Sequence, residues 1–126
     1  MRMGMVEEKL ASLGYRLLQR NNLERRLWIK GEKKVRVVHS SEFKRYVRIL
    51  WREEWKEYYA IIYDYSRAKG PTCIIPVTVL YNSPFVKEKR KTSQYANSGN
   101  WWSQRFPKDH EFRQLVLSYK DRWDLL

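Results

Sequence analysis

The sequence predicts an α+β fold, in which a central mixed, mainly antiparallel sheet of about five or six strands is flanked by an N-terminal and a C-terminal helix. The helices are predicted because apolar residues recur at helical spacing near both ends of the chain. The sheet is predicted because the segments between them are rich in β-branched and aromatic residues that alternate or form short apolar runs. At 126 residues, we expect a single domain spanning residues 1–126.

The first half of the chain reads as a helix followed by strands. Val6, Leu10 and Leu13 form an apolar helical face, and Gly14 stands where a helix commonly ends, which predicts a helix from Val6 to Gly14. Strands are predicted over residues 15–20, 26–30 and 33–41, with turns at 21–22 and 30–33, and a further hairpin arm over 46–51. The charged segment 52–57 is predicted to bridge to the next strand through one helical turn.

The second half contains two near-continuous apolar runs, residues 58–65 and 72–80, which are typical of strands covered on both faces. Pro76 donates no ladder hydrogen bond, so its strand is expected at a sheet edge or with a bulge. Residues 82–107 are predicted to form a long irregular stretch. Asp109 is predicted to cap a final helix. The apolar stripe of that helix would comprise Phe112, Leu115, Tyr119, Trp123 and Leu126.

The composition indicates a polyanionic partner. Lys and Arg number 26 against 14 Asp and Glu, a formal net charge of +12. This balance favours nucleic acid, DNA before RNA, over an anionic membrane surface. No apolar segment approaches the length of a membrane span, so we expect no membrane partner and a cytoplasmic protein, in the host cytoplasm if viral. Cys73 is the only cysteine, which excludes an internal disulfide and predicts a core position.

The strand predicted over 33–41 ends on one of the two histidines. Val35, Val37 and His39 share one face at the two-residue period of a strand, beside a strongly basic opposite face. Cationic and aromatic side chains in other segments would add to this basic face. The predicted nucleic-acid-binding residues are Arg25, Arg26, Lys30, Lys33, Lys34 and Arg36 on the hairpin, Lys44 and Arg45 after it, Lys89, Arg90 and Lys91, and Trp101, Trp102 and Arg105. Trp101 and Trp102 either stack on unpaired bases or anchor their segment in the core.

The predicted element order resembles the core of the restriction-endonuclease-like PD-(D/E)XK nuclease superfamily, especially its small archaeal and viral members. The matching segments are residues 6–15, 26–41, 58–65 and 72–79, the last with its Ile-Pro-Val sequence. The resemblance implies acidic ligands for a divalent metal ion and a lysine near the scissile phosphate. Mapped onto residues 33–41, the motif puts Val37 where the acid is required and His39 where the lysine is required. The chain therefore resembles a degenerate member.

Three functions remain open from the sequence. The first is a nucleic-acid-binding protein on a nuclease-like fold that has lost the catalytic acid and lysine, with no cofactor. The second is an active metal-dependent DNA nuclease with rearranged residues, in which Glu8, Glu24 and His39 are catalytic and Mg²⁺ is required. The third is a small structural or adaptor protein of a mobile element or virus, with exposed aromatics forming a homodimer or partner interface. No tightly spaced metal-binding motif is present in the sequence.

Overall fold

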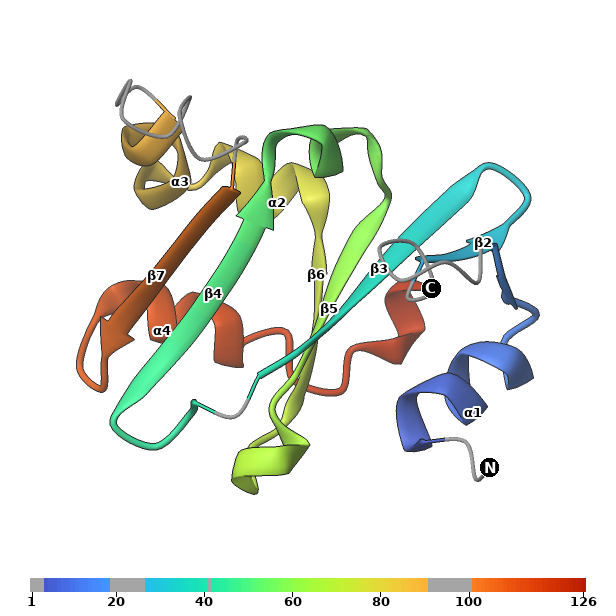
Figure 1. Ribbon diagram of the computed structural model, residues 1–126, viewed down its shortest axis with the longest axis horizontal. Coiled ribbons are helices and arrows are strands. Elements are labelled where there is room, and N and C mark those ends of the chain that lie inside the picture. Colours follow the sequence, from blue (N-terminus) through green and yellow to red (C-terminus); the bar gives the residue numbers. More distant parts are fainter. Residues whose placement is uncertain (1–3, 19–26, 41, 91–100) are drawn as a thin grey trace.

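The computed structural model describes residues 4–18, 27–40, 42–90 and 101–126, with only the backbone described at 88–90 and 101–103. It is an α+β fold, which confirms the predicted class. The main sheet has five strands in the order β1-β2-β3-β5-β6, and β4 and β7 form a two-stranded sheet (Figure 1). The main strands are β1 Arg16–Leu17, β2 Leu27–Lys30, β3 Lys33–His39, β5 Ala60–Asp64 and β6 Thr72–Pro76; the second sheet pairs β4 Tyr46–Arg52 with β7 Trp101–Pro107.

The N-terminal part follows the sequence pattern closely. Helix α1, Met5–Ser12, buries Val6 and Leu10, and Gly14 follows it with a positive φ of 93° that suits a residue without a Cβ. Strands β2 and β3 form the expected antiparallel hairpin, whose turn contains Gly31 at φ 61°. The predicted helix and hairpin are therefore confirmed. The turn predicted at 21–22 and the residues next to it lie outside the described residues.

The parallel pair of β3 and β5 forms the centre of the main sheet. Its register places His39 opposite Asp64 at the carboxyl ends of the two strands. Strand β5 is buried along its whole length, as its apolar sequence predicts. Between the two strands the chain forms β4 and the short 3₁₀ helix η1, Glu53–Glu57, which confirms the predicted helical turn.

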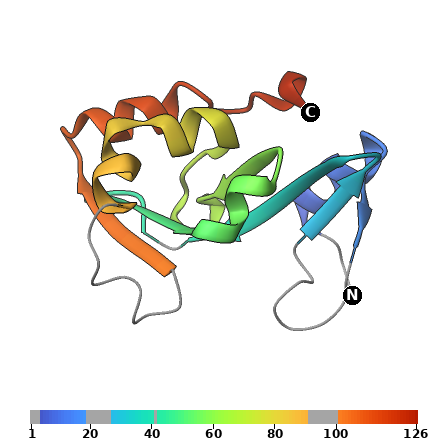
Figure 2. The same ribbon diagram turned by 90° about the horizontal axis from the view of Figure 1, so that it is seen from above.

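The main sheet separates two apolar clusters, because successive residues of its central strands point to opposite faces. On one face, Ile61 and Ile75 pack in a cluster with the β4–β7 sheet. On the other face, Ile62 and Ile74 pack with α1. The β4–β7 sheet and α1 therefore lie at opposite ends of the molecule (Figures 1 and 2). Cys73 is buried in the first cluster, as predicted, and burial raises its pKa to about 12.

Four sequence expectations differ from the structure. Strand β4 is not an arm of the central hairpin, because it pairs with β7. Strand β6 lies at the edge of the main sheet, as Pro76 predicts, but it ends at Pro76, and the residues predicted to continue it form helix α2, Val77–Asn82. The stretch predicted as irregular contains helix α3, Pro84–Arg90, and β7. For β4 and β7 the reason is their pairing with each other across a long stretch of chain, which local sequence does not specify.

The fourth difference concerns the last helix. Helix α4, Glu111–Leu117, is capped by His110, whose Nδ1 accepts a hydrogen bond from the backbone N–H of Phe112, in place of the predicted Asp109. The helix ends before the predicted stripe does, and the stripe divides between the two clusters. Phe112, Leu115 and Tyr119 pack with the first cluster, and Trp123 and Leu126 with the second. Within the described part of the chain, no helix is long and apolar enough to cross a membrane.

Candidate functional site

The carboxyl ends of β3 and β5 bring polar side chains together at one edge of the main sheet. Parallel strands end at the same edge, and ligands of open α/β sheets commonly bind there. His39 is the last residue of β3 and Asp64 the last residue of β5. The chain then continues into two segments that both carry cationic residues, residues 42–46 after β3 and the 3₁₀ helix η2, Ser66–Ala68, after β5.

Asp64 holds the His39 ring in one orientation. Nδ1 of His39 donates to Oδ2 of Asp64 at 2.9 Å, since an ionised carboxylate only accepts. Oδ1 of Asp64 accepts from the backbone N–H of Ser66 at 3.0 Å and from the hydroxyl of Thr72 at 3.3 Å. Burial raises the pKa of Asp64, but the hydrogen bonds from His39 and Ser66 outweigh it and lower the pKa to about 2. Asp64 is therefore a buried, ionised carboxylate.

A second carboxylate lies on the other side of the ring. Oε1 of Glu7, from α1, is 3.7 Å from Nε2 of His39. The His39 side chain is 12% exposed and that of Glu7 28% exposed, so this edge of the imidazole is reached by solvent more easily than the Asp64 edge. A histidine whose Nδ1 is held by a carboxylate presents Nε2 as a base or ligand. Among the described residues, no group of three or more His, Cys, Asp or Glu side chains could hold a metal ion.

The structure thus places the predicted catalytic residues as follows. His39 lies in the group just described, whereas Glu8 is an exposed residue of α1, and Glu24 lies outside the described residues. The carboxylates that the structure brings to His39 are Glu7 and Asp64, which the sequence analysis missed. Asp64 carried a signal: an acidic residue inside an apolar strand must find hydrogen-bond partners.

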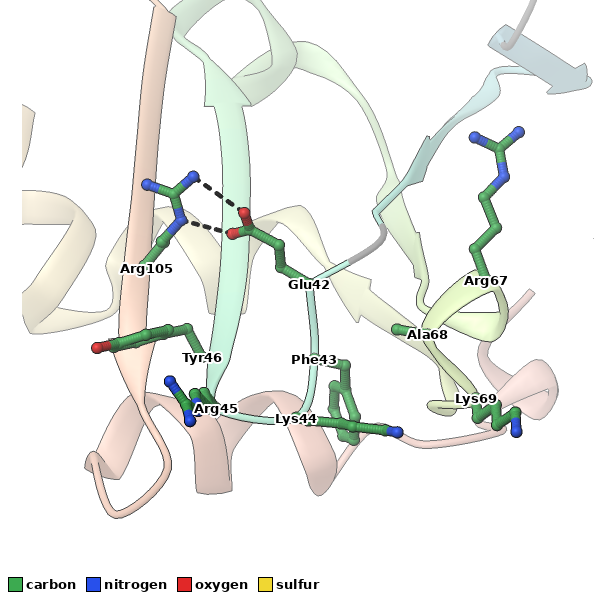
Figure 3. A pocket seen from close by; sticks show the side chains of 9 residues that line it. All are labelled: Glu42, Phe43, Lys44, Arg45, Tyr46, Arg67, Ala68, Lys69 and Arg105. Atoms are coloured by element: carbon green, nitrogen blue, oxygen red, sulfur yellow. Dashed lines mark hydrogen bonds and ion pairs between the residues drawn. The ribbon is translucent and has the colours of Figure 1, made fainter.

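A basic pocket lies beside this edge of the sheet. It has a volume of about 780 Å³. Figure 3 shows that its cationic side chains come from two sides, Lys44, Arg45 and Arg105 from the side of β4 and β7, and Arg67 and Lys69 from η2 and the residue after it. Its remaining described lining residues are Glu42, Phe43, Tyr46 and Ala68. The structure therefore joins three predicted binding residues to two that the sequence analysis missed.

Glu42 is the acidic residue among those lining the pocket, and Arg105 binds it. Nε and Nη2 of Arg105 donate to the two carboxylate oxygens at 2.6 and 2.9 Å. This hydrogen-bonded pair lowers the pKa of Glu42, and the charge of Arg48 adds to the effect. Arg48 lies directly opposite Arg105 in the β4–β7 ladder, an arrangement of like charges that is unfavourable in itself. The Glu42 carboxylate therefore interacts electrostatically with both guanidinium groups, and it binds Arg105 directly.

The other predicted binding residues lie elsewhere. The turn joining β2 and β3 is at the far end of β3 from the pocket (Figure 1). Its cations contact aromatic rings: Nζ of Lys33 is 4.8 Å from the ring centre of Tyr59, and Nζ of Lys30 is 5.8 Å from that of Tyr15. Lys34 is exposed, and Arg36 is packed over a ring of Trp55 at 5.1 Å. Lys89 and Arg90 lie in α3, and Trp101 and Trp102 in β7, with only their backbone described; Arg25, Arg26 and Lys91 lie outside the described residues.

These features define an α+β protein in which an oriented histidine and a basic pocket adjoin the carboxyl ends of two parallel strands. Comparisons of the chain with protein-family models, with curated proteins and with solved structures found no match.

Proposed function

We propose that the protein binds nucleic acid, DNA before RNA, through the basic pocket. The observation that carries this proposal is the presence of five cationic side chains among the residues that line one pocket, whose carboxylate is already bound by Arg105. Lysine and arginine side chains are the groups that contact phosphate oxygens, and the net charge of +12 attracts a polyanion from a distance. A small anion would use the pocket but would not account for the charge of the whole chain.

The resemblance to PD-(D/E)XK nucleases belongs to the same proposal. The chain would be a nuclease-like fold in which Val37 and His39 replace the acid and the lysine, leaving a binding surface without the original chemistry. Val37 is buried in the cluster that packs with α1, and its side chain offers no ligand atom for a metal ion. No cofactor is required for this function.

The first test is the salt dependence of binding. We expect a fluorescently labelled oligonucleotide to bind at 50 mM monovalent salt and to be released steeply as salt rises, because cationic contacts displace counterions from the phosphates. The logarithm of the affinity should fall linearly with the logarithm of salt concentration, with a slope of about −0.7 to −0.9 per phosphate contact. Anisotropy titrations at four salt concentrations measure it. Failure to bind, or an affinity independent of salt, would contradict the proposal.

A second candidate function is cleavage of nucleic acid, and the orientation of His39 by Asp64 favours it. A histidine held in this way at the end of β3, just before the segment that lines the basic pocket, could act as a general base. The residues described fit a Mg²⁺ site poorly, because Mg²⁺ prefers several oxygen ligands. Asp64 already accepts hydrogen bonds from His39, Ser66 and Thr72, which leaves the Glu7 carboxylate and one imidazole edge. Unlike nucleic-acid binding, this candidate function requires that the protein cleaves the nucleic acid that it binds.

A cleavage assay separates the two functions. If the protein is a nuclease, duplex, branched or single-stranded DNA should be cut with Mg²⁺ or Mn²⁺ present, and His39→Ala should lower the rate by about 100-fold or more, the usual range for loss of a general base. His110→Asn is the matched control, because it changes the other histidine and keeps a residue that caps helices well. The absence of cleavage, or equal rates for wild type and His39→Ala, would exclude this candidate.

A further inference from the structure

Three large apolar side chains are exposed among the described residues: Met5 at 66%, Tyr46 at 45% and Tyr59 at 40%. The two tyrosines differ in the contacts that their side chains make. Tyr59 is engaged, because its hydroxyl donates to the carbonyl of Leu125 at 2.8 Å and Lys33 lies over its ring. Tyr46 lines the basic pocket instead.

Tyr46 is placed beside the pocket cations by the pleat of the β4–β7 sheet. It is the first residue of β4, directly opposite Pro107, and it shares a face of the ladder with the Arg48–Arg105 pair. Val47 is fully buried, so the alternation along β4 turns Tyr46 outward. Figure 3 shows its ring on the β4–β7 side of the pocket, pointing away from the turn that carries Arg67 and Lys69. Tyr46 is also close enough to Arg105 to add to the effect of Glu42, which raises the pKa of that guanidinium.

The other aromatic residue of the pocket has a structural role. The Phe43 ring centre lies 5.2 Å from that of the buried Tyr65, and the guanidinium of Arg113 lies 4.5 Å from the Phe43 ring. Arg113 also donates to the Phe43 carbonyl at 2.7 Å. Phe43 therefore fixes the segment after β3 to the rest of the protein, and Tyr46 is the exposed aromatic surface of the pocket.

We propose that the pocket receives an unpaired nucleotide, with backbone phosphates contacting Lys44, Arg45 and Lys69 and a base stacked on Tyr46. This inference rests on the proposed function and narrows its ligand to single-stranded or locally unpaired nucleic acid. Bases in a duplex are covered on both faces by their neighbours, so only an unpaired base can use the ring. The pocket volume of about 780 Å³ lies within the range of ligand-binding pockets, about 300–1,000 Å³.

The experiment compares one oligonucleotide as a single strand and as a duplex, by anisotropy at the same salt concentration, for wild type, Tyr46→Ala and Tyr46→Phe. We expect Tyr46→Ala to weaken single-strand binding by at least about five-fold, the lower end for loss of one stacking aromatic. Tyr46→Phe should stay within about two-fold of wild type, because it keeps the stacking ring. Duplex affinity should be the same for all three proteins, and unfolding midpoints should confirm that each is folded.

The outcomes distinguish this inference from the function on which it rests. If wild type binds neither form, the proposed function fails as well. If wild type binds but Tyr46→Ala leaves single-strand affinity unchanged, or weakens duplex binding equally, the stacking inference alone is overturned. A loss confined to the single strand and restored in Tyr46→Phe supports it.

Discussion

Replacing Lys44, Arg45 and Lys69 together by glutamine should lower the affinity for single-stranded nucleic acid about 100-fold at 0.1 M salt. Counterion release gives each phosphate contact about a five-fold contribution at that concentration, and the three contributions multiply. The slope of the log–log salt plot should become shallower by about 2 for the same reason. All three side chains are exposed lining residues of the pocket, so their removal should leave the fold intact. Anisotropy titrations of wild type and the triple variant measure both quantities.

The matched control removes the same number of charges from the other end of β3. Lys30, Lys33 and Lys34 are exposed residues of the β2–β3 hairpin, and their replacement by glutamine lowers the net charge by the same three units. We expect this variant to lose much less affinity than the pocket variant. Equal losses would mean that the overall field of the protein binds the ligand, and the pocket would no longer be the site.

Asp64→Ala should lower the free energy of unfolding by about 3–5 kcal/mol at pH 7, because each buried donor left without its acceptor costs about 1–3 kcal/mol. The variant would leave the Thr72 hydroxyl, the Ser66 N–H and His39 Nδ1 without their acceptor. Urea unfolding monitored by tryptophan fluorescence measures the change. Glu8→Ala is the control, because it removes an exposed carboxylate of α1 and should change stability by less than about 0.5 kcal/mol. Similar effects for both variants would contradict the role given to Asp64.

The dependence on pH tests the same carboxylate independently. Its pKa in the folded protein is about 2, below the ordinary value of 3.8, so the folded state favours the ionised form. The resulting stability, about 2 kcal/mol, is fully present above pH 4 and is lost as the pH falls towards 2. Asp64→Asn keeps the shape of the side chain and should remove this part of the acid sensitivity. An unchanged profile between pH 4 and 2 would show that Asp64 titrates normally.

The sequence predicted those parts of the fold that depend on neighbouring residues. The spacing of Val6 and Leu10 identified α1, and Gly31 with the alternating residues beside it identified the β2–β3 hairpin. The apolar run over residues 58–65 identified β5, Ala60–Asp64. In each case the local pattern and the tertiary environment favour the same structure.

Pairing between distant segments was not predictable in this way. The alternation in residues 46–51 correctly indicated a strand, but nothing local to it specifies β7 as its partner. The pocket depends on the same pairing, since it brings Arg105 next to Glu42. It also depends on the parallel pairing of β3 with β5, because the segments after these strands carry Lys44 and Arg67 to the same pocket. The charges of Lys44, Arg45 and Arg105 predicted each of them as a binding residue. Only the pairing of the strands brings them to one pocket.

The position of β4 in the chain, between β3 and β5, also has a consequence for the order of folding. All five strands of the main sheet are contained in residues 16–76. Strand β4, in contrast, pairs with β7, which begins only at Trp101. Closing that longer loop carries an additional entropic cost, so the pairing of β4 with β7 should be a late event. Arg105 meets Glu42 only when this pairing is complete. A ligand bound across both walls of the pocket would therefore hold the last strand in place, and binding would be coupled to the completion of folding.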